Sequence, residues 1–183
     1  MDAKQSLLDL FGALNEGGPP LSILQRILLI TDGTVTDVLE AYANEPIRVV
    51  KLEQSFGSVD ARRPELDLPP SGRVLRRTVL LQGAISGQNF LFADSVITPD
   101  GLAPEIVDGL IGSDRPVGRL LAQHRVETFR EIVALGFELA GTCAEHFDVE
   151  PTSRLVFRTY RILVGGQPVM RITEKFPLGL FTD

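Results

Sequence analysis

The sequence predicts an α+β domain, in which a single antiparallel β-sheet carries helices mainly on one of its faces. Strand-like segments gather in two groups, and glycine-bearing connections within both groups indicate hairpins. Helical segments stand before and between these groups, as is typical of an antiparallel sheet covered on one side. With 183 residues, the chain is expected to be a single domain over 1–183, with residues 1–20 as a peripheral helix and loop.

Three helical segments open the chain. Lys4–Leu14 has the spacing of a short amphipathic helix, which a Gly-Gly-Pro-Pro run then ends. Leu21–Ile30 again has helical spacing. Asp32 or Thr34 can cap the next helix, because short polar side chains accept hydrogen bonds from the free N–H groups of a first turn. That helix is expected to run to about residue 42.

Three strands are predicted next, at Pro46–Phe56, Arg73–Gln82 and Asn89–Thr98. The polar, proline-rich stretch at 57–72 separates the first two strands as a loop. The sequence GAISGQ joins the other two as a hairpin connection. These strands form the first of the two groups.

Two helices and a hairpin complete the predicted fold. We expect a helix at Pro104–Ile111 and a longer helical stretch over Gly118–Ala140 that breaks near Arg125. Leu155–Val164 and Gln167–Phe176 then read as strands joined by a Gly-Gly pair. Such a two-residue loop is a strong hairpin signal.

Composition excludes several classes of function. The net charge of −6 argues against nucleic acid as a partner. The lone Cys143 excludes an internal disulfide, and His124 and His146 lack the spacing of metal ligands, so no metal is expected. No apolar run approaches the length of a membrane span and no leader-like segment opens the chain, which predicts a cytoplasmic protein without a membrane partner. The oligomeric state is left open.

Two charged residues fall where strand alternation places apolar side chains. Side chains on a strand alternate between its faces, so residues two apart share a face. On two of the predicted strands, an otherwise apolar face then carries one charge, as in Leu75, Arg77, Val79 and Leu81 and in Met170, Ile172, Glu174 and Phe176. A charge turned into apolar surroundings is costly unless it has a partner. Arg77 and Glu174 therefore either pair or bind a polar ligand.

The last hairpin adds a further candidate. If the two glycines form the turn, Arg161 faces Met170 and therefore shares the inward face with Glu174. The two charges are then about 13 Å apart along the sheet, too far to pair directly. This register turns Arg158 and Tyr160 to the outer face.

Each candidate has a structural alternative. Arg77 and Glu174 can belong to a buried ion pair with no role beyond packing. Arg161 can bind a second carboxylate of a ligand, or its aliphatic stem can pack against the sheet. Glu127 and Arg130 lie three residues apart in the predicted long helix, where an intrahelical ion pair is expected.

The chain resembles the chorismate lyase (4-hydroxybenzoate synthase) family, and in particular the branch related to mycobacterial enzymes. Five stretches spread in order over most of Leu21–Leu178 carry the resemblance. They are DGTVTDVL from Asp32, GRVLRRTVLLQG from Gly72, RPVG from Arg115 with the following VETFRE, RTYRIL from Arg158, and GGQPVMRITEKF from Gly165. The resemblance implies a six-stranded antiparallel sheet, helices on one side and an internal site closed by two flaps.

The resemblance also implies roles for individual residues. Arg77 matches the arginine that binds the ring carboxylate, and Glu174 matches the glutamate that binds the 4-oxygen and assists proton transfer. The family's backbone N–H contact to the carboxylate falls on Val117, beside Gly118. A backbone group of the first flap falls near Val35, which follows Thr34.

The implied activity is that of a lyase that converts chorismate to 4-hydroxybenzoate and pyruvate without a cofactor. Substrate and product are the implied partners. Two alternatives stay open: a module of the same fold that binds a small aromatic acid without turnover, and a relative that acts on a different substrate. The effector-sensing domain of a repressor is less favoured, because only about twenty residues precede the region Leu21–Leu178 that carries the resemblance, and no basic recognition helix is apparent.

Overall fold

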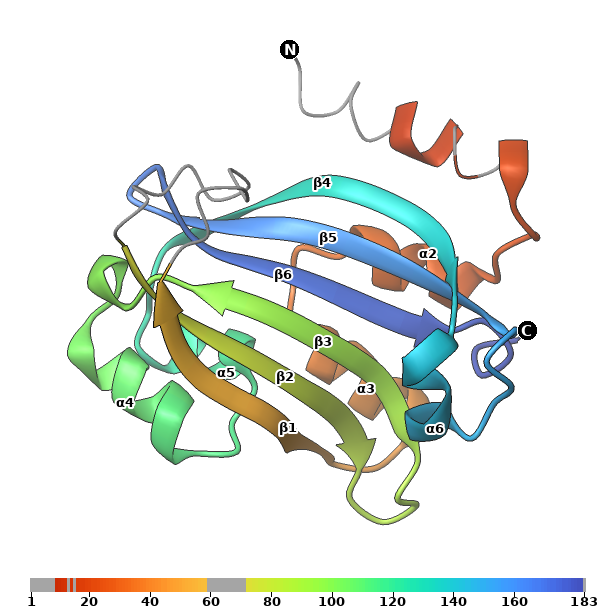
Figure 1. Ribbon diagram of the computed structural model, residues 1–183, viewed down its shortest axis with the longest axis horizontal. Helices are drawn as coiled ribbons and strands as arrows, with labels where there is room; N and C mark the ends of the chain where they lie inside the picture. The colour runs from red at the N-terminus through yellow and green to blue at the C-terminus, as the bar shows by residue number, and fades with distance from the viewer. Residues whose placement is uncertain (1–8, 13, 15, 59–71, 183) are drawn as a thin grey trace.

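A six-stranded antiparallel sheet forms the centre of the computed structural model, which describes residues 9–12, 14, 16–58 and 72–182 (Figure 1). The strand order is β1-β2-β3-β6-β5-β4, so two meanders meet where β3 pairs with β6. The strands are β1 (Ile47–Ser58), β2 (Arg73–Gly83), β3 (Asn89–Ile97), β4 (Thr128–Leu139), β5 (Arg154–Val164) and β6 (Gln167–Pro177). The predicted fold class is confirmed, and the two meanders correspond to the two groups of strands.

Most helices cover one face of this sheet, which we call the inner face. In Figure 1, α2, α3 and α5 lie behind the sheet, and the main core joins them and α4 to that face. A smaller cluster packs the short α6 on the outer face, against Leu80 and Phe92. The helices are α2 (Ile23–Ile30), α3 (Val35–Ala43), α4 (Pro104–Gly112), α5 (Val117–Gln123) and α6 (Ala144–Phe147), with 3₁₀ turns η2 (Pro99–Gly101) and η3 (Gly141–Cys143).

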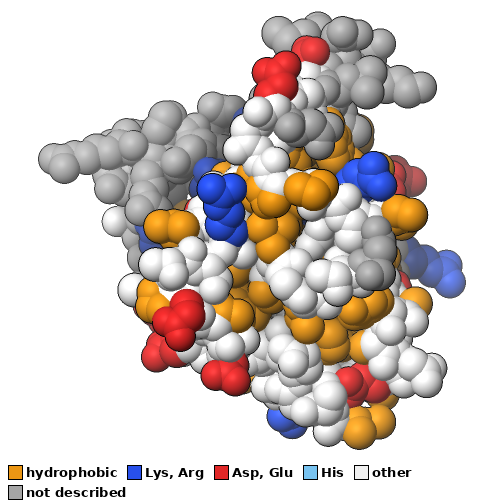
Figure 2. Space-filling view, turned by 90° about the vertical axis from the view of Figure 1, so that its right-hand side faces the viewer, with side chains coloured by type: hydrophobic (Ala, Val, Ile, Leu, Met, Phe, Trp, Pro, Cys, Tyr) orange, Lys and Arg blue, Asp and Glu red, His pale blue; other side chains and the backbone are white. Residues whose placement is uncertain are grey.

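Helix α2 has a capped N-terminus, a buried side and an exposed side. Ser22 and Gln25 form a capping box, in which each side chain accepts a hydrogen bond from the other residue's backbone N–H. Leu28 is buried, whereas Ile23 and Ile27 remain 61% and 44% exposed. Figure 2 shows apolar side chains among polar and charged ones on the side of the molecule at the right of Figure 1. Among the described residues, no helix is long and apolar enough to cross a membrane.

Two predicted segments lie partly outside the described residues. Of the helix expected at Lys4–Leu14, residues 9–12 and 14 are described and are helical. Leu14 is buried and belongs to the main core, so this segment is packed against the domain. The loop expected at 57–72 falls mostly on 59–71, which are not among the described residues.

The long helix predicted over Gly118–Ala140 is wrong beyond its first turns. Helix α5 ends at Gln123, and Arg125 takes a left-handed backbone with φ of 52°. From Thr128 the chain runs as β4, which pairs with β5 along its whole length. Backbone pairing with a neighbouring strand overrides the apolar spacing that resembled a helix. Glu127 therefore does not form the expected intrahelical pair with Arg130.

The predicted register of the last hairpin is correct at the turn and wrong beyond it. Val164 pairs with Gln167 and Leu163 with Pro168, but Ile162 then pairs with Met170. Val169 is thus an extra residue on β6, a β-bulge that moves all later pairs by one. Pro168 explains the position, because proline has no N–H for the sheet and is tolerated at bulges.

The shifted register corrects the predicted orientation of β5. Arg158 pairs with Glu174 in the sheet and Tyr160 pairs with Ile172, so both side chains lie on the inner face. Arg161, predicted to face inward, lies on the outer face and forms an ion pair with Glu131 at 2.6 Å. The prediction that Arg161 faces the ligand site is therefore wrong.

Candidate functional site

A cavity lies on the inner face of the sheet, beneath the first turns of α3 and α5. Its floor is apolar and is contributed by β1, β2, β3 and β6. Its walls are the segments 33–36 and 116–118, which precede and begin the two helices. The floor residues are Val49, Val79, Leu81, Leu91, Ala93 and Ile172, and the polar side chains at the cavity include Thr34, Arg77, Ser95, Arg130, Tyr160 and Glu174.

Arg77 is a buried cation with two nitrogens that have no hydrogen-bond partner among the described residues. Its side chain projects from β2 and the residue is only 4% exposed. Nε and Nη2 are buried and find no hydrogen-bond acceptor in the described part of the chain. Burial lowers the pKa of Arg77, and the charge of Asp114 offsets part of that effect. Because a buried, unsatisfied guanidinium is costly, its presence in a cavity indicates an anionic ligand.

Glu174 has two partners on the neighbouring strand. Arg158 Nε donates to Glu174 Oε2 at 2.6 Å, and the Tyr160 hydroxyl donates to Oε1 at 3.0 Å. Both side chains reach the carboxylate from β5 because the bulge at Val169 turns them inward. A carboxylate has about four acceptor positions, so Glu174 can still accept a hydrogen bond from a ligand in the cavity.

Arg158 is held on several sides. It is 1% exposed, donates from Nη1 to the carbonyl oxygen of Thr31 at 2.8 Å, and lies 4.9 Å from the centre of the Tyr160 ring. Burial lowers the pKa of Arg158, but Glu174 and Tyr160 together more than offset this effect, so the net pKa is raised. Burial, and then the Glu174 charge, raise the pKa of Tyr160, so Tyr160 is a neutral donor.

The two wall segments pack closely at Gly118. A Cβ at this position would lie 2.4 Å from Cγ2 of Thr34, so the approach of the two segments requires glycine. Val117 and Gly118 form the first turn of α5, whose N–H groups have no acceptor within the helix. Val35 begins α3 on the opposite wall and is buried.

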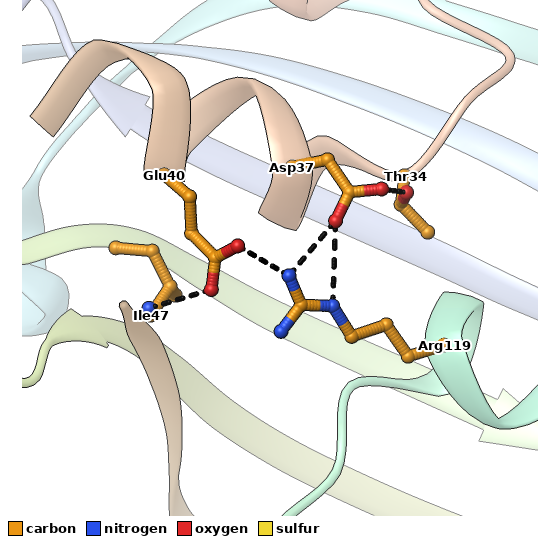
Figure 3. Close-up of polar contacts among 5 residues, drawn as sticks. All are labelled: Thr34, Asp37, Glu40, Ile47 and Arg119. Carbon is orange, nitrogen blue, oxygen red and sulfur yellow. Dashed lines mark hydrogen bonds and ion pairs between the residues drawn. The ribbon is translucent and has the colours of Figure 1, made fainter. Parts of the chain in front are cut away.

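An ion-pair network joins the helices behind these walls (Figure 3). Arg119 of α5 contacts Asp37 of α3, with Nη2 at 2.9 Å from Oδ1, and also contacts Glu40. Glu40 in turn accepts from the backbone N–H of Ile47 at 2.9 Å, and the Thr34 hydroxyl donates to Asp37. These bonds, first from Thr34 and then from Arg119, lower the pKa of Asp37. The network connects α3, α5 and the start of β1.

The structure brings together every predicted site residue except Arg161. Arg77, Glu174, Thr34, Val35, Val117 and Gly118 all line the one cavity. Three inner-face residues were missed, namely Arg130, Arg158 and Tyr160. Pro168 was the signal that could have corrected the register and thereby found Arg158 and Tyr160. In the described part of the chain, no group of three or more His, Cys, Asp or Glu side chains is arranged to hold a metal ion.

Solved structures share the fold at low sequence identity. The effector domain of PhnF from Mycobacterium smegmatis matches with a TM-score of 0.67 at 10% identity, covering 84% of this chain and 93% of that one. The C-terminal domain of the histidine utilization repressor from Pseudomonas syringae pv. tomato matches with a TM-score of 0.56 at 14% identity, covering 75% and 95%. The fold thus places the chain in a class of single-sheet α+β domains, and in this chain a polar site lies beneath the helices.

Sequence comparison resolves the family within that class. The chain belongs to the chorismate pyruvate-lyase Rv2949c-like family, whose sequence model matches residues 29–182. It is similar to a chorismate pyruvate-lyase of Mycobacterium leprae, with 38% identity over 159 residues, or 86% of this chain and 76% of that protein. A chorismate pyruvate-lyase of Mycobacterium tuberculosis is 34% identical over 162 residues, with 86% and 81% covered. The resemblance found in the sequence is confirmed.

Proposed function

We propose that this protein is a chorismate pyruvate-lyase, which converts chorismate to 4-hydroxybenzoate and pyruvate. Family membership supports the reaction. The observation that carries the proposal is the cavity itself. It is lined by the buried Arg77, whose Nε and Nη2 have no acceptor among the described residues, and by the Arg158-bound Glu174. A planar aromatic acid with a 4-hydroxyl group offers a complementary group to each.

The reaction needs little beyond positioning. The ether bond between ring carbon 3 and the enolpyruvyl oxygen breaks, the hydrogen on ring carbon 4 leaves as a proton, and the enolpyruvyl methylene gains a proton to give pyruvate. Atoms and electrons balance without an oxidant, reductant or further reactant. Because formation of the aromatic ring drives the reaction, we propose that it proceeds without cofactor or metal. We also propose that the protein acts in the cytoplasm.

Arg77 is assigned to the ring carboxylate. A guanidinium binds a planar carboxylate through two parallel hydrogen bonds, and the unsatisfied Nε and Nη2 of Arg77 present such a pair of donors. In the same assignment, the backbone N–H of Val117, in the first turn of α5, donates a hydrogen bond to the ring carboxylate. The segment of Thr34 and Val35 covers the ring. An apolar floor strengthens each of these polar contacts.

Glu174 is assigned to the 4-oxygen. Arg158 and Tyr160 hold the carboxylate on both of its oxygens, so its orientation is fixed before the ligand binds. The 4-hydroxyl can then donate to Glu174. From this position Glu174 assists proton transfer, with two routes for the proton on ring carbon 4: to Glu174, or directly to the enolpyruvyl methylene.

Turnover of chorismate tests the proposal. The purified protein, treated with a chelator, should release pyruvate and 4-hydroxybenzoate in equal amounts. Chorismate incubated with the Arg77→Met variant gives the background. Pyruvate release no faster than this background would reject the lyase and favour a binding module, a role consistent with the fold shared with the repressor domain.

The Glu174→Gln variant tests the assignment of proton transfer. It keeps the shape of the side chain and removes the carboxylate, so turnover should fall by about 10²–10⁴-fold, the range for general acid–base catalysis. Affinity for 4-hydroxybenzoate should fall much less. If Glu174→Gln turned over chorismate at the wild-type rate, direct transfer of the ring carbon 4 proton to the enolpyruvyl methylene would be favoured instead.

A further inference from the structure

The substrate of the proposed reaction has two carboxylates, and Arg77 accounts for one of them. Chorismate carries one carboxylate on the ring and another on the enolpyruvyl group, whereas 4-hydroxybenzoate keeps only the ring carboxylate. The second carboxylate also needs a cation in a cavity with an apolar floor. Arg161, the residue predicted for this role, lies on the outer face beside Glu131.

Arg130 is a second cation at the cavity. It lies on β4, where it pairs in register with Ile162 of β5, while Ile132 pairs with Tyr160. Residues that pair across strands share a face, so Arg130 lies on the inner face with Tyr160. Its side chain lines the cavity, and its Nη2 is 3.6 Å from the position of a Cβ on Gly118. The guanidinium therefore reaches the wall formed by α5.

Among the residues that the structure describes, Arg130 has no anionic partner, unlike its arginine neighbours Arg158 and Arg161. Arg158 is bound to Glu174 and Arg161 to Glu131. Within the described ranges, no hydrogen bond or ion pair to the Arg130 side chain is found, although the residue is half-buried. A half-buried arginine at a cavity without a carboxylate beside it is available for an anionic ligand.

The charges at the cavity match a dianion. Arg158 and Glu174 neutralise one another, which leaves Arg77 and Arg130 as the cations facing the cavity among the described residues. They come from strands four places apart in the sheet, about 19 Å between backbones at ordinary strand spacing. Two long side chains that enter from opposite sides can bind the two ends of one small molecule. These two cations face the cavity although the chain as a whole is acidic, with a net charge of −6.

We infer that Arg130 recognises the enolpyruvyl carboxylate, and so distinguishes the dianionic substrate from the monoanionic product. This assignment rests on the proposed lyase function. It divides recognition between two arginines: Arg77 binds the carboxylate that substrate and product share, and Arg130 binds the one that leaves with pyruvate. Loss of the Arg130 contact after the ether breaks would favour release of the products.

A binding experiment isolates this contact from catalysis. The probes are 3-(carboxymethoxy)-4-hydroxybenzoate, which carries a second carboxylate on an unreactive ether, and its neutral carboxamide analogue. Calorimetry with wild type and Arg130→Gln should show an affinity loss of about ten- to hundredfold for the dicarboxylate, as expected for a hydrogen bond to a charged group. Affinity for the carboxamide and for 4-hydroxybenzoate should change less than about twofold.

Matched variants guard against indirect effects. Arg130→Lys should recover part of the affinity for the dicarboxylate. Arg171→Gln makes the same change in net charge on the outer face and should leave all three affinities unchanged. Equal losses for the dicarboxylate and the carboxamide, or no loss for either, would overturn the assignment. If Arg130→Gln does not fold, Arg130→Lys replaces it in the test: its affinity for the dicarboxylate must be lower than that of wild type, and its affinities for the other two compounds must be unchanged.

Kinetics separate this assignment from the proposed function. With chorismate, Arg130→Gln should raise KM more than it lowers kcat and leave product inhibition by 4-hydroxybenzoate unchanged. A wild-type protein without turnover that still shows the selective loss of dicarboxylate binding would reject the lyase and keep the Arg130 site. If the wild-type protein turns over chorismate and Arg130→Gln has an unchanged KM, the Arg130 site is rejected and the lyase function is kept.

Discussion

Arg77 and Arg158 project from two strands onto the same face of the sheet, yet their surroundings differ. Both are buried, with 4% and 1% exposure. Arg158 is bound to Glu174, to the carbonyl oxygen of Thr31 and to the face of Tyr160. Arg77 has two N–H-bearing nitrogens, Nε and Nη2, that find no acceptor among the described residues.

The difference separates two uses of a buried charge. A charge whose partners are all in the protein fixes the position of another side chain, here Glu174. A buried charge without hydrogen-bond partners in the protein is available to bind a ligand. Until the ligand binds, this unsatisfied charge lowers the stability of the folded state. Burial alone would not distinguish the two arginines. Their hydrogen-bond partners do.

Replacing Arg158 should have the largest effect on stability. Arg158→Met fills a similar volume but leaves the Glu174 carboxylate buried and unpaired, so the free energy of unfolding should fall by about 3–5 kcal/mol. Urea unfolding at pH 7 measures this loss. The double variant Arg158→Met/Glu174→Met is the control, and it should recover most of the stability while remaining inactive. A single variant as stable as wild type would contradict the assigned ion pair.

Replacing Arg77 should have the opposite effect on stability. Arg77→Met removes an unsatisfied buried cation, so the unliganded protein should gain about 1–3 kcal/mol in its free energy of unfolding. Binding of 4-hydroxybenzoate should weaken by about 2–5 kcal/mol, because the ring carboxylate loses its charged partner. Calorimetry and urea unfolding of the same preparation check both. A variant that loses stability and keeps affinity would show that Arg77 is structural.

A pair of ligands tests the contact at Glu174. 4-Hydroxybenzoate should bind more tightly than benzoate by about 1–3 kcal/mol, because benzoate leaves the desolvated carboxylate without its ligand donor. Ligands that bind the folded state raise the melting temperature, so a thermal-shift titration ranks the two compounds. In Glu174→Gln the difference should shrink. Equal stabilisation of wild type by both compounds would remove Glu174 from recognition of the 4-position.

The smallest effect on stability is expected at the network between the two walls. Arg119 is partly exposed, so Arg119→Met should cost no more than about 1 kcal/mol of stability. The pKa of Asp37 is lowered by its bonds to Thr34 and Arg119. The contribution of the pair is thus present above the ordinary carboxyl pKa and is lost as the pH falls through the lowered value.

The same variant should change product release. If α3 and α5 must separate for 4-hydroxybenzoate to leave, Arg119→Met should raise the dissociation rate in stopped-flow measurements, since opening of a lid often limits turnover. Arg115→Met, which replaces an exposed arginine outside this network, is the control. Equal dissociation rates in both variants would mean that the network does not hold the site closed.

Much of the fold followed from local pattern. Alternation placed Arg77 and Glu174 on the inner face because β2 and β6 keep a regular period over those residues. The hairpin turn was also correct, since its two glycines both take positive φ. The resemblance to a known family implied six strands, one more than the five predicted from pattern, but it did not identify Thr128–Leu139 as the sixth.

The failures have one physical origin, which is pairing between strands. Whether Thr128–Leu139 is helical or extended depends on the β5 edge beside it, which no local spacing records. Arg158 and Tyr160 were placed on the wrong face because the bulge at Val169, the third residue after the turn, reverses the parity of all later pairs. Arg130 was missed with β4, for the same reason.

The bulge at Val169 has a consequence for how this site can change during evolution. Because one extra residue on β6 sets the parity of β5, Arg158 and Tyr160 depend on it together. A deletion there would turn both side chains out of the cavity in a single genetic event and bring Thr159 and Arg161 in. Relatives can therefore gain or lose the support of Glu174 through the length of a hairpin, with every residue that touches the ligand left unsubstituted.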